Sequence, residues 1–441
     1  MPTKLIMITT GKTMKKLTFI CSVVYIVLLS VTSSIAVAHD HKKMSMKMAD
    51  KSPVKCQYEQ IVCAKTMTTA FAPNGDLWRV WSVNQHIYFQ VSKDVGKSFG
   101  SEHLVDIPAE KISARNENRP KIGFDNNNGV YLSWAKSGKK RFTGDIRFSY
   151  SANGGKTFTA PITVNNDNLI TGHSFNEMMV NAAGDVTIVW LDSRYSYQQK
   201  LAGNSVNGSD LYLAKGNPSK IHSFKSNVFK KNALINSNVF SNEAIARGTC
   251  VCCRIAMEED SKGNLSVFWR HIFGDNIREF ALLTIDESKP ALAQVKQISH
   301  DQWYIQGCPH QGGGISIDQN NRYHLVWYNQ GDKGKGIFYA FSDNAGDKIS
   351  QPIAIGNNER QAAHPHIKHT GNIVDIIWLE FDGKVHQLWH QQSVDRGETF
   401  QAANILAESS EGFDRPFIIS QGTNRVVSWQ RPNMGHWLGR L

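Results

Sequence analysis

The stretch Asn128-Gly-Val-Tyr-Leu-Ser-Trp134, with Ser151-Ala-Asn-Gly-Gly-Lys-Thr-Phe158 behind it, decides the fold class. The first part is a Gly-containing turn that leads into an alternating run ending in Trp. The second part is a turn rich in Ser, Asn and Gly that ends in Phe. Short alternating runs bounded by such residues are typical of antiparallel β-strands. The stretch therefore predicts a hairpin-based β unit.

The first part of this unit recurs along the chain of 441 residues. The same turn and alternating strand precede Trp81, Trp134, Trp190, Trp269, Trp327, Trp378 and Trp429. The interval is longer only between Trp190 and Trp269, which indicates an insertion near residues 195–245. Because β repeats of this kind build propellers, we expect an all-β fold: a single β-propeller with seven four-stranded blades. The last repeat lacks an outer strand of its own, and residues 58–63 are expected to supply it.

The second part of the unit also recurs. Good copies are Ser92-Lys-Asp-Val-Gly-Lys-Ser-Phe99, Ser151 to Phe158 and Ser393-Val-Asp-Arg-Gly-Glu-Thr-Phe400, and Ser342 to Ile349 is a weaker copy. In such a turn Asp or Asn binds turn amides, and Gly takes a positive φ. The pattern resembles the Asp box (BNR repeat) of sialidases and related propellers, over residues 66–441. Sialidases have six blades, so six is the alternative to the seven that the Trp strands indicate.

The N-terminus has the features of an export signal. Met14-Lys15-Lys16 begins a positive region, residues 17–37 are almost wholly apolar or small, and Ala36-Val37-Ala38 matches a signal peptidase site. We expect residues 1–38 to be a signal peptide, with Met14 as an alternative start. A flexible His/Met-rich tail at 39–55 and the propeller at 56–441 follow, in the periplasm or outside the cell. An uncleaved membrane anchor is the alternative; no later segment is expected to span a membrane.

The formal net charge is +11, which favours attraction to acidic surfaces such as membranes, polysaccharides or nucleic acids. The basic residues are scattered, however, and no run is longer than Lys139-Lys140-Arg141 or Lys230-Lys231. We interpret the charge as solvation and weak steering, and expect no nucleic acid partner. A glycan or another exported protein is the expected partner of a monomer.

Thiols and imidazoles recur where the inner strands of three adjacent blades are expected to begin. Two interpretations stay open for them: disulfides that join blades four and five, or soft ligands for copper or zinc. The candidate metal ligands are Cys250, Cys252, Cys253, Cys308, His310, His364 and His366. Trp303 and Tyr304, just ahead of Cys308, are expected either to shield this site or to stack on a sugar.

The expected mature N-terminus adds a second candidate copper site. A free amine followed by His at the third position resembles the amino-terminal Cu(II)/Ni(II) motif, and the thioethers of a Met-rich stretch suit Cu(I). The tail ligands would be His39, His41, Met44, Met46 and Met48. Cys56 and Cys63 are expected to form a structural disulfide.

The resemblance to sialidases implies a different site. Those enzymes bind the substrate carboxylate with three arginines, and Arg119, Arg254 and Arg415 are the candidates here. The Phe/Tyr-Arg-Ile-Pro motif of sialidases is absent from the first blade. Glu243 and Asp192 are only nominal acids, and no convincing Tyr nucleophile is found.

The sequence therefore leaves three functions, and whether the protein is an enzyme stays open. The preferred hypothesis is an exported propeller with a Cys/His metal site at its central funnel, in metal handling or redox chemistry. The alternatives are a sialidase-like glycoside hydrolase that uses the arginine cluster, and a non-catalytic module that binds glycan or protein.

Overall fold

A computed structural model describes residues 61–115, 117–220, 239–286, 294–411 and 414–441. The expected signal peptide, the His/Met-rich tail and Cys56 lie outside these residues. Within them, no helix is both long and apolar enough to cross a membrane.

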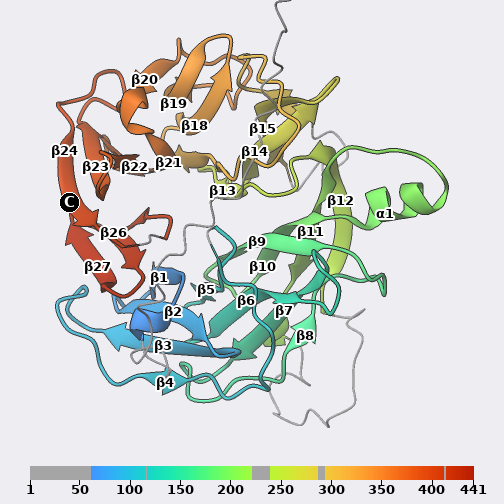
Figure 1. The fold of residues 1–441 in the computed structure, drawn as a ribbon. Coiled ribbons are helices and arrows are strands. Elements are labelled where there is room, and N and C mark those ends of the chain that lie inside the picture. The colour runs from blue at the N-terminus through green and yellow to red at the C-terminus, as the bar shows by residue number, and fades with distance from the viewer. Residues whose placement is uncertain (1–60, 116, 221–238, 287–293, 412–413) are drawn as a thin grey trace, which may run out of the picture. The chain divides into compact units, whose positions relative to one another are not determined.

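The described chain is built from antiparallel strands that follow one another in sequence (Figure 1). Blade one contains β1 (Met67–Phe71), β2 (Leu77–Val83), β3 (His86–Ser92) and β4 (His103–Leu104); blade two contains β5 (Lys121–Phe124), β6 (Val130–Ser137), β7 (Gly144–Ser151) and β8 (Ile162–Thr163). Blade three contains β9 (His173–Val180), β10 (Val186–Asp192), β11 (Ser209–Gly216) and β12 (Ser241–Thr249); blade four contains β13 (Ala256–Glu259), β14 (Leu265–Phe273), β15 (Ile277–Ile285) and β16 (Lys296–Gln297).

The second half repeats the arrangement. Blade five contains β17 (Gly314–Ile317), β18 (Tyr323–Gly331), β19 (Gly334–Ser342) and β20 (Ile353–Ile355); blade six contains β21 (Ala363–Thr370), β22 (Ile373–Phe381), β23 (His386–Ser393) and β24 (Asn404–Ser409); blade seven contains β25 (Phe417–Gln421), β26 (Asn424–Arg431) and β27 (Gly435–Arg440). The helices are α1 (Arg194–Leu201) in the long interval of blade three, and 3₁₀ turns at Ile61–Cys63, Pro218–Lys220 and Asn358–Arg360.

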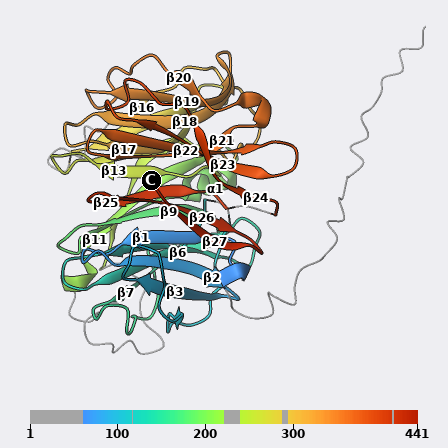
Figure 2. The same cartoon turned by 90° about the vertical axis from the view of Figure 1, so that its left-hand side faces the viewer.

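The first strands of the seven blades form a closed ring. Each of β1, β5, β9, β13, β17, β21 and β25 contacts the next, and β25 contacts β1. Figures 1 and 2 accordingly show the first and last sheets side by side. The prediction of an all-β propeller is confirmed, and the described residues form seven blades.

Two details differ from the expected seven separate four-stranded sheets. Among the described residues the sheet of blade seven has three strands, and Ile61–Cys63, the part of the expected fourth strand that the structure describes, is a 3₁₀ turn packed on β27. The side-chain amide of Gln430 donates to the carbonyls of Ile61 and Ala64. In a β-strand, such carbonyls would accept hydrogen bonds from the backbone of the neighbouring strand instead. Blades three and four share one sheet, because Thr249 at the end of β12 pairs with His271 in β14.

The recurring tryptophans form the core between the blades. Each lies in the second strand of its blade and is at most 1% exposed: Trp81, Trp134, Trp190, Trp269, Trp327, Trp378 and Trp429. Burying a large aromatic on the strand beside the inner one gives each blade a common packing unit. The Trp repeat therefore predicts the fold from the sequence, because the same seven tryptophans form the core of the propeller.

The Ser-rich turns share one set of hydrogen bonds. In blade six the Ser393 hydroxyl donates to Asp395 Oδ1 and accepts from the Gly397 amide at 2.8 Å, and Asp395 Oδ1 also accepts from the Thr399 amide. The equivalent bonds recur in the turns that begin at Ser92, Ser151 and Ser342. The weaker sequence copy in blade five therefore forms the same turn.

The glycine of this turn is required by its position between blades. Gly155 has φ +82°, and a Cβ there would lie 2.9 Å from the Trp78 ring of the preceding blade. Gly96 and Gly346 meet Leu438 and Leu282 of their preceding blades in the same way. The turn thus fixes the contact between neighbouring blades as well as its own conformation.

Candidate functional site

A cleft of about 1150 Å³ lies where the chain enters the inner strands of blades two to five. Its walls are the segment before β5, the β6–β7 hairpin and the start of β9. Its floor includes Cys252, Cys308 and His310, from the segments before β13 and β17. The loops at one end of a propeller's strands can vary in sequence, because the strands form a rigid scaffold that holds the loops in position.

The walls of this cleft are strongly basic. None of its described lining residues is Asp or Glu, and seven are Lys or Arg: Lys65, Lys111, Arg115, Lys136, Lys139, Lys140 and Arg141. Within the described part of the chain, only Lys136 of these seven has an acidic partner, since its Nζ lies 3.3 Å from Glu110 Oε1. The six others are exposed. Sequence reasoning treated these charges as scattered, because folding rather than chain order brings them together.

An aromatic side chain stands among these cations. Phe142, at the tip of the β6–β7 hairpin, is 73% exposed and has φ +60°. The Arg141 guanidinium lies over its ring, 4.5 Å from the centroid. An exposed ring beside cations offers a flat apolar surface and charge together. In the sequence, the run Lys139-Lys140-Arg141 followed by Phe142 was the pattern that could have indicated this part of the cleft.

A buried histidine, His173, contacts the first residue of β7 in this hairpin. His173 Nδ1 lies 2.7 Å from the Gly144 carbonyl, and Nε2 lies 2.9 Å from Asp167 Oδ2 and 3.4 Å from Asp192 Oδ2. Burial alone would lower the pKa of His173, but the hydrogen bond with Asp167 and the charges of the two carboxylates raise it above its ordinary value. Both ring nitrogens are engaged, so His173 holds the start of β7 in place rather than offering a free base.

The cysteines of blade four converge, as the sequence predicted. Cys250 Sγ lies 3.8 Å from Cys252 Sγ and 3.7 Å from Cys253 Sγ, and all three residues are buried. A second group is formed by Cys252, Cys308 and His310, whose ligand atoms lie within 4.8 Å of one another. Cys252 belongs to both groups, and Cys308 and His310 are exposed. The structure records Cys250, Cys252, Cys253 and Cys308 as free thiols.

The three buried thiols differ in acidity. Hydrogen bonds from Cys252 and Cys253 hold the pKa of Cys250 well below its ordinary value. The pKa of Cys252 is raised, mainly by its hydrogen bond to Cys250, and burial raises the pKa of Cys253. The charges of Arg270 and Arg278 lower the pKa of Cys250 further.

The two remaining histidine candidates lie elsewhere. His364 and His366 belong to neither convergent group of the described residues. His366 faces the axial channel, where its Nδ1 accepts from the Ile418 amide at 3.3 Å. Burial lowers the pKa of both imidazoles, so both are neutral.

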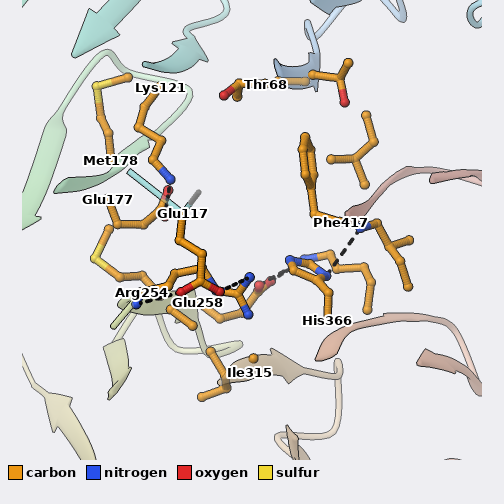
Figure 3. Close-up of a pocket in the computed structure, with 18 of the residues that line it drawn as sticks. Thr68, Glu117, Lys121, Glu177, Met178, Arg254, Glu258, Ile315, His366 and Phe417 are labelled. Carbon is orange, nitrogen blue, oxygen red and sulfur yellow. Dashed lines mark hydrogen bonds and ion pairs between the residues drawn. The ribbon is translucent and has the colours of Figure 1, made fainter. Parts of the chain in front are cut away.

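The three candidate arginines line a second cavity, the axial channel of about 380 Å³ between the inner strands. Figure 3 shows Arg254 in this channel beside Glu117. Arg119 NH2 lies 2.8 Å from Asp414 Oδ1, and Arg254 donates to the carbonyls of Gly313 and Pro365 and lies 3.6 Å from Glu117. Arg415 lines the same channel and is largely buried.

Other charges of the channel are paired too. Lys121 Nζ lies 2.6 Å from Glu177, which Figure 3 shows across the cavity from Phe417, and Lys368 Nζ lies 2.8 Å from Glu258. This pairing favours a structural role for the arginines, which bridge inner strands, over an open clamp for a substrate carboxylate.

The other sequence candidates do not form an acidic pair across one funnel. Asp192 is buried and accepts hydrogen bonds from Arg194 and Trp190, whereas Glu243 is exposed on β12 and lines neither cavity. Trp303 is buried against Arg270, 4.7 Å from its guanidinium, and Tyr304 is 56% exposed.

Comparisons with known proteins agree with this fold. No protein-family model matches the chain, and no curated protein sequence matches it. Among solved structures, an ulvan lyase of polysaccharide lyase family PL25 bound to -[GlcA(1-4)Rha3S]- is similar with a TM-score of 0.53 and 10% identity, over 87% of this chain and 92% of that one. Polysaccharide lyase Uly1 is similar with a TM-score of 0.50 and 11% identity, over 83% of this chain and 86% of that one.

A sialidase is also among the similar structures. The Hadza microbial sialidase Hz136 has a TM-score of 0.45 and 9% identity, over 83% of this chain and 77% of that one. At these identities the likeness concerns the fold alone. The chain thus has a β-propeller fold, which it shares with the polysaccharide lyases.

Proposed function

We propose that this protein is a glycan-active β-propeller whose basic cleft binds an acidic polysaccharide, one that carries uronate or sulfate groups. The observation that carries the proposal is the cleft of about 1150 Å³ with seven Lys or Arg side chains and no acidic residue among those described. Clefts lined by charge of one sign focus the field and attract ligands of the opposite sign.

Two further observations support a saccharide rather than another polyanion. Phe142 presents an exposed ring beside the Arg141 guanidinium in the lining of the cleft, which suits the apolar face of a sugar. The fold is shared with an ulvan lyase that was solved with a saccharide containing GlcA, a uronic acid. Since that likeness is one of fold, the ligand class here rests on the cleft itself.

The site does not support a sialidase mechanism. Arg119 and Arg254 already bind carboxylates and carbonyls of the channel walls, and the described lining of the cleft has no Asp or Glu that could serve as the acid/base residue of a sialidase. The proposal is therefore for recognition of an acidic chain by the cleft, with elimination chemistry as the reaction to assay alongside binding.

Binding is tested by calorimetric titration with ulvan, with polygalacturonate and with neutral arabinan as probes. The wild type is expected to bind the two acidic polymers and not arabinan. A K139S/K140S/R141S variant is expected to lose about 10-fold or more in affinity, because three cations leave one wall of the cleft.

The matched control removes the same charge from the opposite end of the strands. Lys97, Lys262 and Lys348 are exposed in turns at that end, and a K97S/K262S/K348S variant is expected to bind as the wild type does. Equal losses in both variants would show a mere net-charge effect and contradict the cleft. Tighter binding of DNA than of either acidic glycan would contradict the ligand class. Unsaturated uronate absorbance during incubation would identify the protein as a lyase.

A further inference from the structure

The thiols below the cleft have the geometry of ligands around one ion. With a metal–sulfur distance of about 2.3 Å, two thiolates on one ion lie about 3.8 Å apart at a tetrahedral angle and about 4.0 Å apart at a trigonal angle. The two measured separations from Cys250 Sγ are 3.8 Å and 3.7 Å. A disulfide would instead need about 2.05 Å.

The donor set selects a soft ion. The two convergent groups contain four thiols and one imidazole and no carboxylate. Soft thiolates suit Cu(I) and Zn(II), whereas Mg(II) and Ca(II) need oxygen ligands. The buried group offers three donors, and its residues are only 1% to 5% exposed, which leaves little access for water as a fourth ligand. Structural Zn(II) is almost always four-coordinate, so three buried thiolates favour Cu(I).

The exposed pair lies on the way to the buried thiols. Cys308 and His310 are exposed at the floor of the cleft, and Cys252 lines the same floor although it is buried. His310 has φ +52°, a left-handed conformation that is uncommon for a residue other than Gly. Cys252 belongs to both groups. Its Sγ lies within 4.8 Å of the ligand atoms of the four other residues, Cys250, Cys253, Cys308 and His310.

We propose that these five residues form a two-stage Cu(I) site, in which Cys308 and His310 receive the ion at the cleft floor and Cys252 hands it to Cys250 and Cys253. Cys252 keeps its bond to copper throughout. The bonds to Cys308 and His310 break as the bonds to Cys250 and Cys253 form. Each thiol that binds releases its proton to water, and the Cys308 thiolate takes up a proton from water as it leaves. Copper stays Cu(I), so no electron is transferred. Arg270 and Arg278 lie near Cys250 and offset part of the negative charge of the buried thiolates.

The site is tested on the full chain with Cu(I) under anaerobic reducing conditions, by competition with the chelator bicinchoninate. Substituting Ser and Gly throughout residues 39–48 removes the tail ligands, and this background is used for all variants. The parent is expected to bind one Cu(I) per chain. Cys250→Ser is expected to weaken binding about 100-fold or more, since it removes the ligand shared by both measured sulfur pairs.

The transfer step is tested by the rate of loading in stopped-flow experiments. A C308S/H310Q variant is expected to keep an affinity close to that of the parent but to load about 10-fold more slowly or worse. The control His300→Gln removes another exposed imidazole of the same connecting segment and should load at the parental rate. Equal rates for C308S/H310Q and the parent would overturn the transfer route.

The remaining outcomes are also decisive. If Cys250→Ser does not fold, X-ray absorption of the copper-loaded parent replaces it. Sulfur neighbours at about 2.3 Å support the buried site, and only nitrogen or oxygen neighbours overturn it. Preferential retention of Zn(II) over Cu(I) would overturn the choice of metal. A chain two hydrogens lighter that binds no ion would show a disulfide instead. None of these measurements depends on the glycan proposal.

Discussion

Arg119 and Asp414 form a buried ion pair, 2.8 Å between NH2 and Oδ1, between residues separated by 295 positions in the chain. Asp414 also accepts from the Met67 amide, and Arg119 donates to the Met67 carbonyl. The pair therefore binds the segment before blade seven, the first strand of blade one and the segment before blade two to each other. It acts as a clasp at the point where the ring closes.

Breaking this clasp should destabilise the whole propeller. Asp414→Asn is expected to lower the free energy of unfolding by about 3–5 kcal/mol, because it takes the negative charge of Asp414 away from the buried Arg119 guanidinium. Thermal and urea midpoints measure the loss. Asp347→Asn removes an exposed partner of Lys296 and should cost less than about 1 kcal/mol. Equal effects of the two substitutions would contradict the clasp.

Two glycines with the same φ allow the stability cost of the close approach between blades to be measured apart from the cost of backbone strain. Gly155 and Gly263 both have φ +82°, but only Gly155 has atoms within 4 Å of the position that a Cβ would take, the nearest belonging to Trp78. Gly263→Ala should cost about 1–2 kcal/mol for the left-handed conformation. Gly155→Ala should cost about 1–3 kcal/mol more, through overpacking. Thermal midpoints compare them, and similar values would show that the turn does not fix the blade contact.

The raised pKa of His173 makes stability depend on pH. Its folded-state pKa lies above the unfolded value of about 6.5, so its contribution is full below that pH and is lost as pH rises through the folded pKa. His173→Gln should therefore cost about 1.5–3 kcal/mol at acidic pH and less at alkaline pH. Melting curves across this range test it, with the exposed His300→Gln as control. A loss independent of pH would mean that the imidazole is not held in its charged form.

Binding in the cleft should be weakened by salt. The screening length falls from about 10 Å at 0.1 M to about 3 Å at 1 M ionic strength, and six of the seven cleft cations are exposed. Titrations with ulvan at rising NaCl should give a steep fall in affinity for the wild type and a shallower one for K139S/K140S/R141S. Identical slopes would indicate that these three cations do not contact the glycan.

The fold could be read from the sequence because its core residues are also its repeat. Seven tryptophans mark seven second strands, and the Ser-rich turns mark the contacts between blades. The outer strand of blade seven could not be read, since the Gln430 side chain decides the conformation of Ile61–Cys63.

The site was only partly predictable. Aligning the starts of the inner strands brought the cysteines and His310 together correctly, since equivalent positions meet in a ring. The alignment also grouped His364 and His366 with them, whereas the structure places both outside the two cysteine groups and places His366 in the lining of the channel. The basic cleft was missed because Lys65, Lys111 and Lys139 come from separate connections.

The continuous sheet of blades three and four has a mechanical consequence. The Thr249–His271 pairing joins these two blades through their backbones and makes their strands one sheet. The Cys250–Cys253 segment begins directly after that join. A movement of blade three against blade four would therefore have to break this pairing and would displace the three thiols beside it.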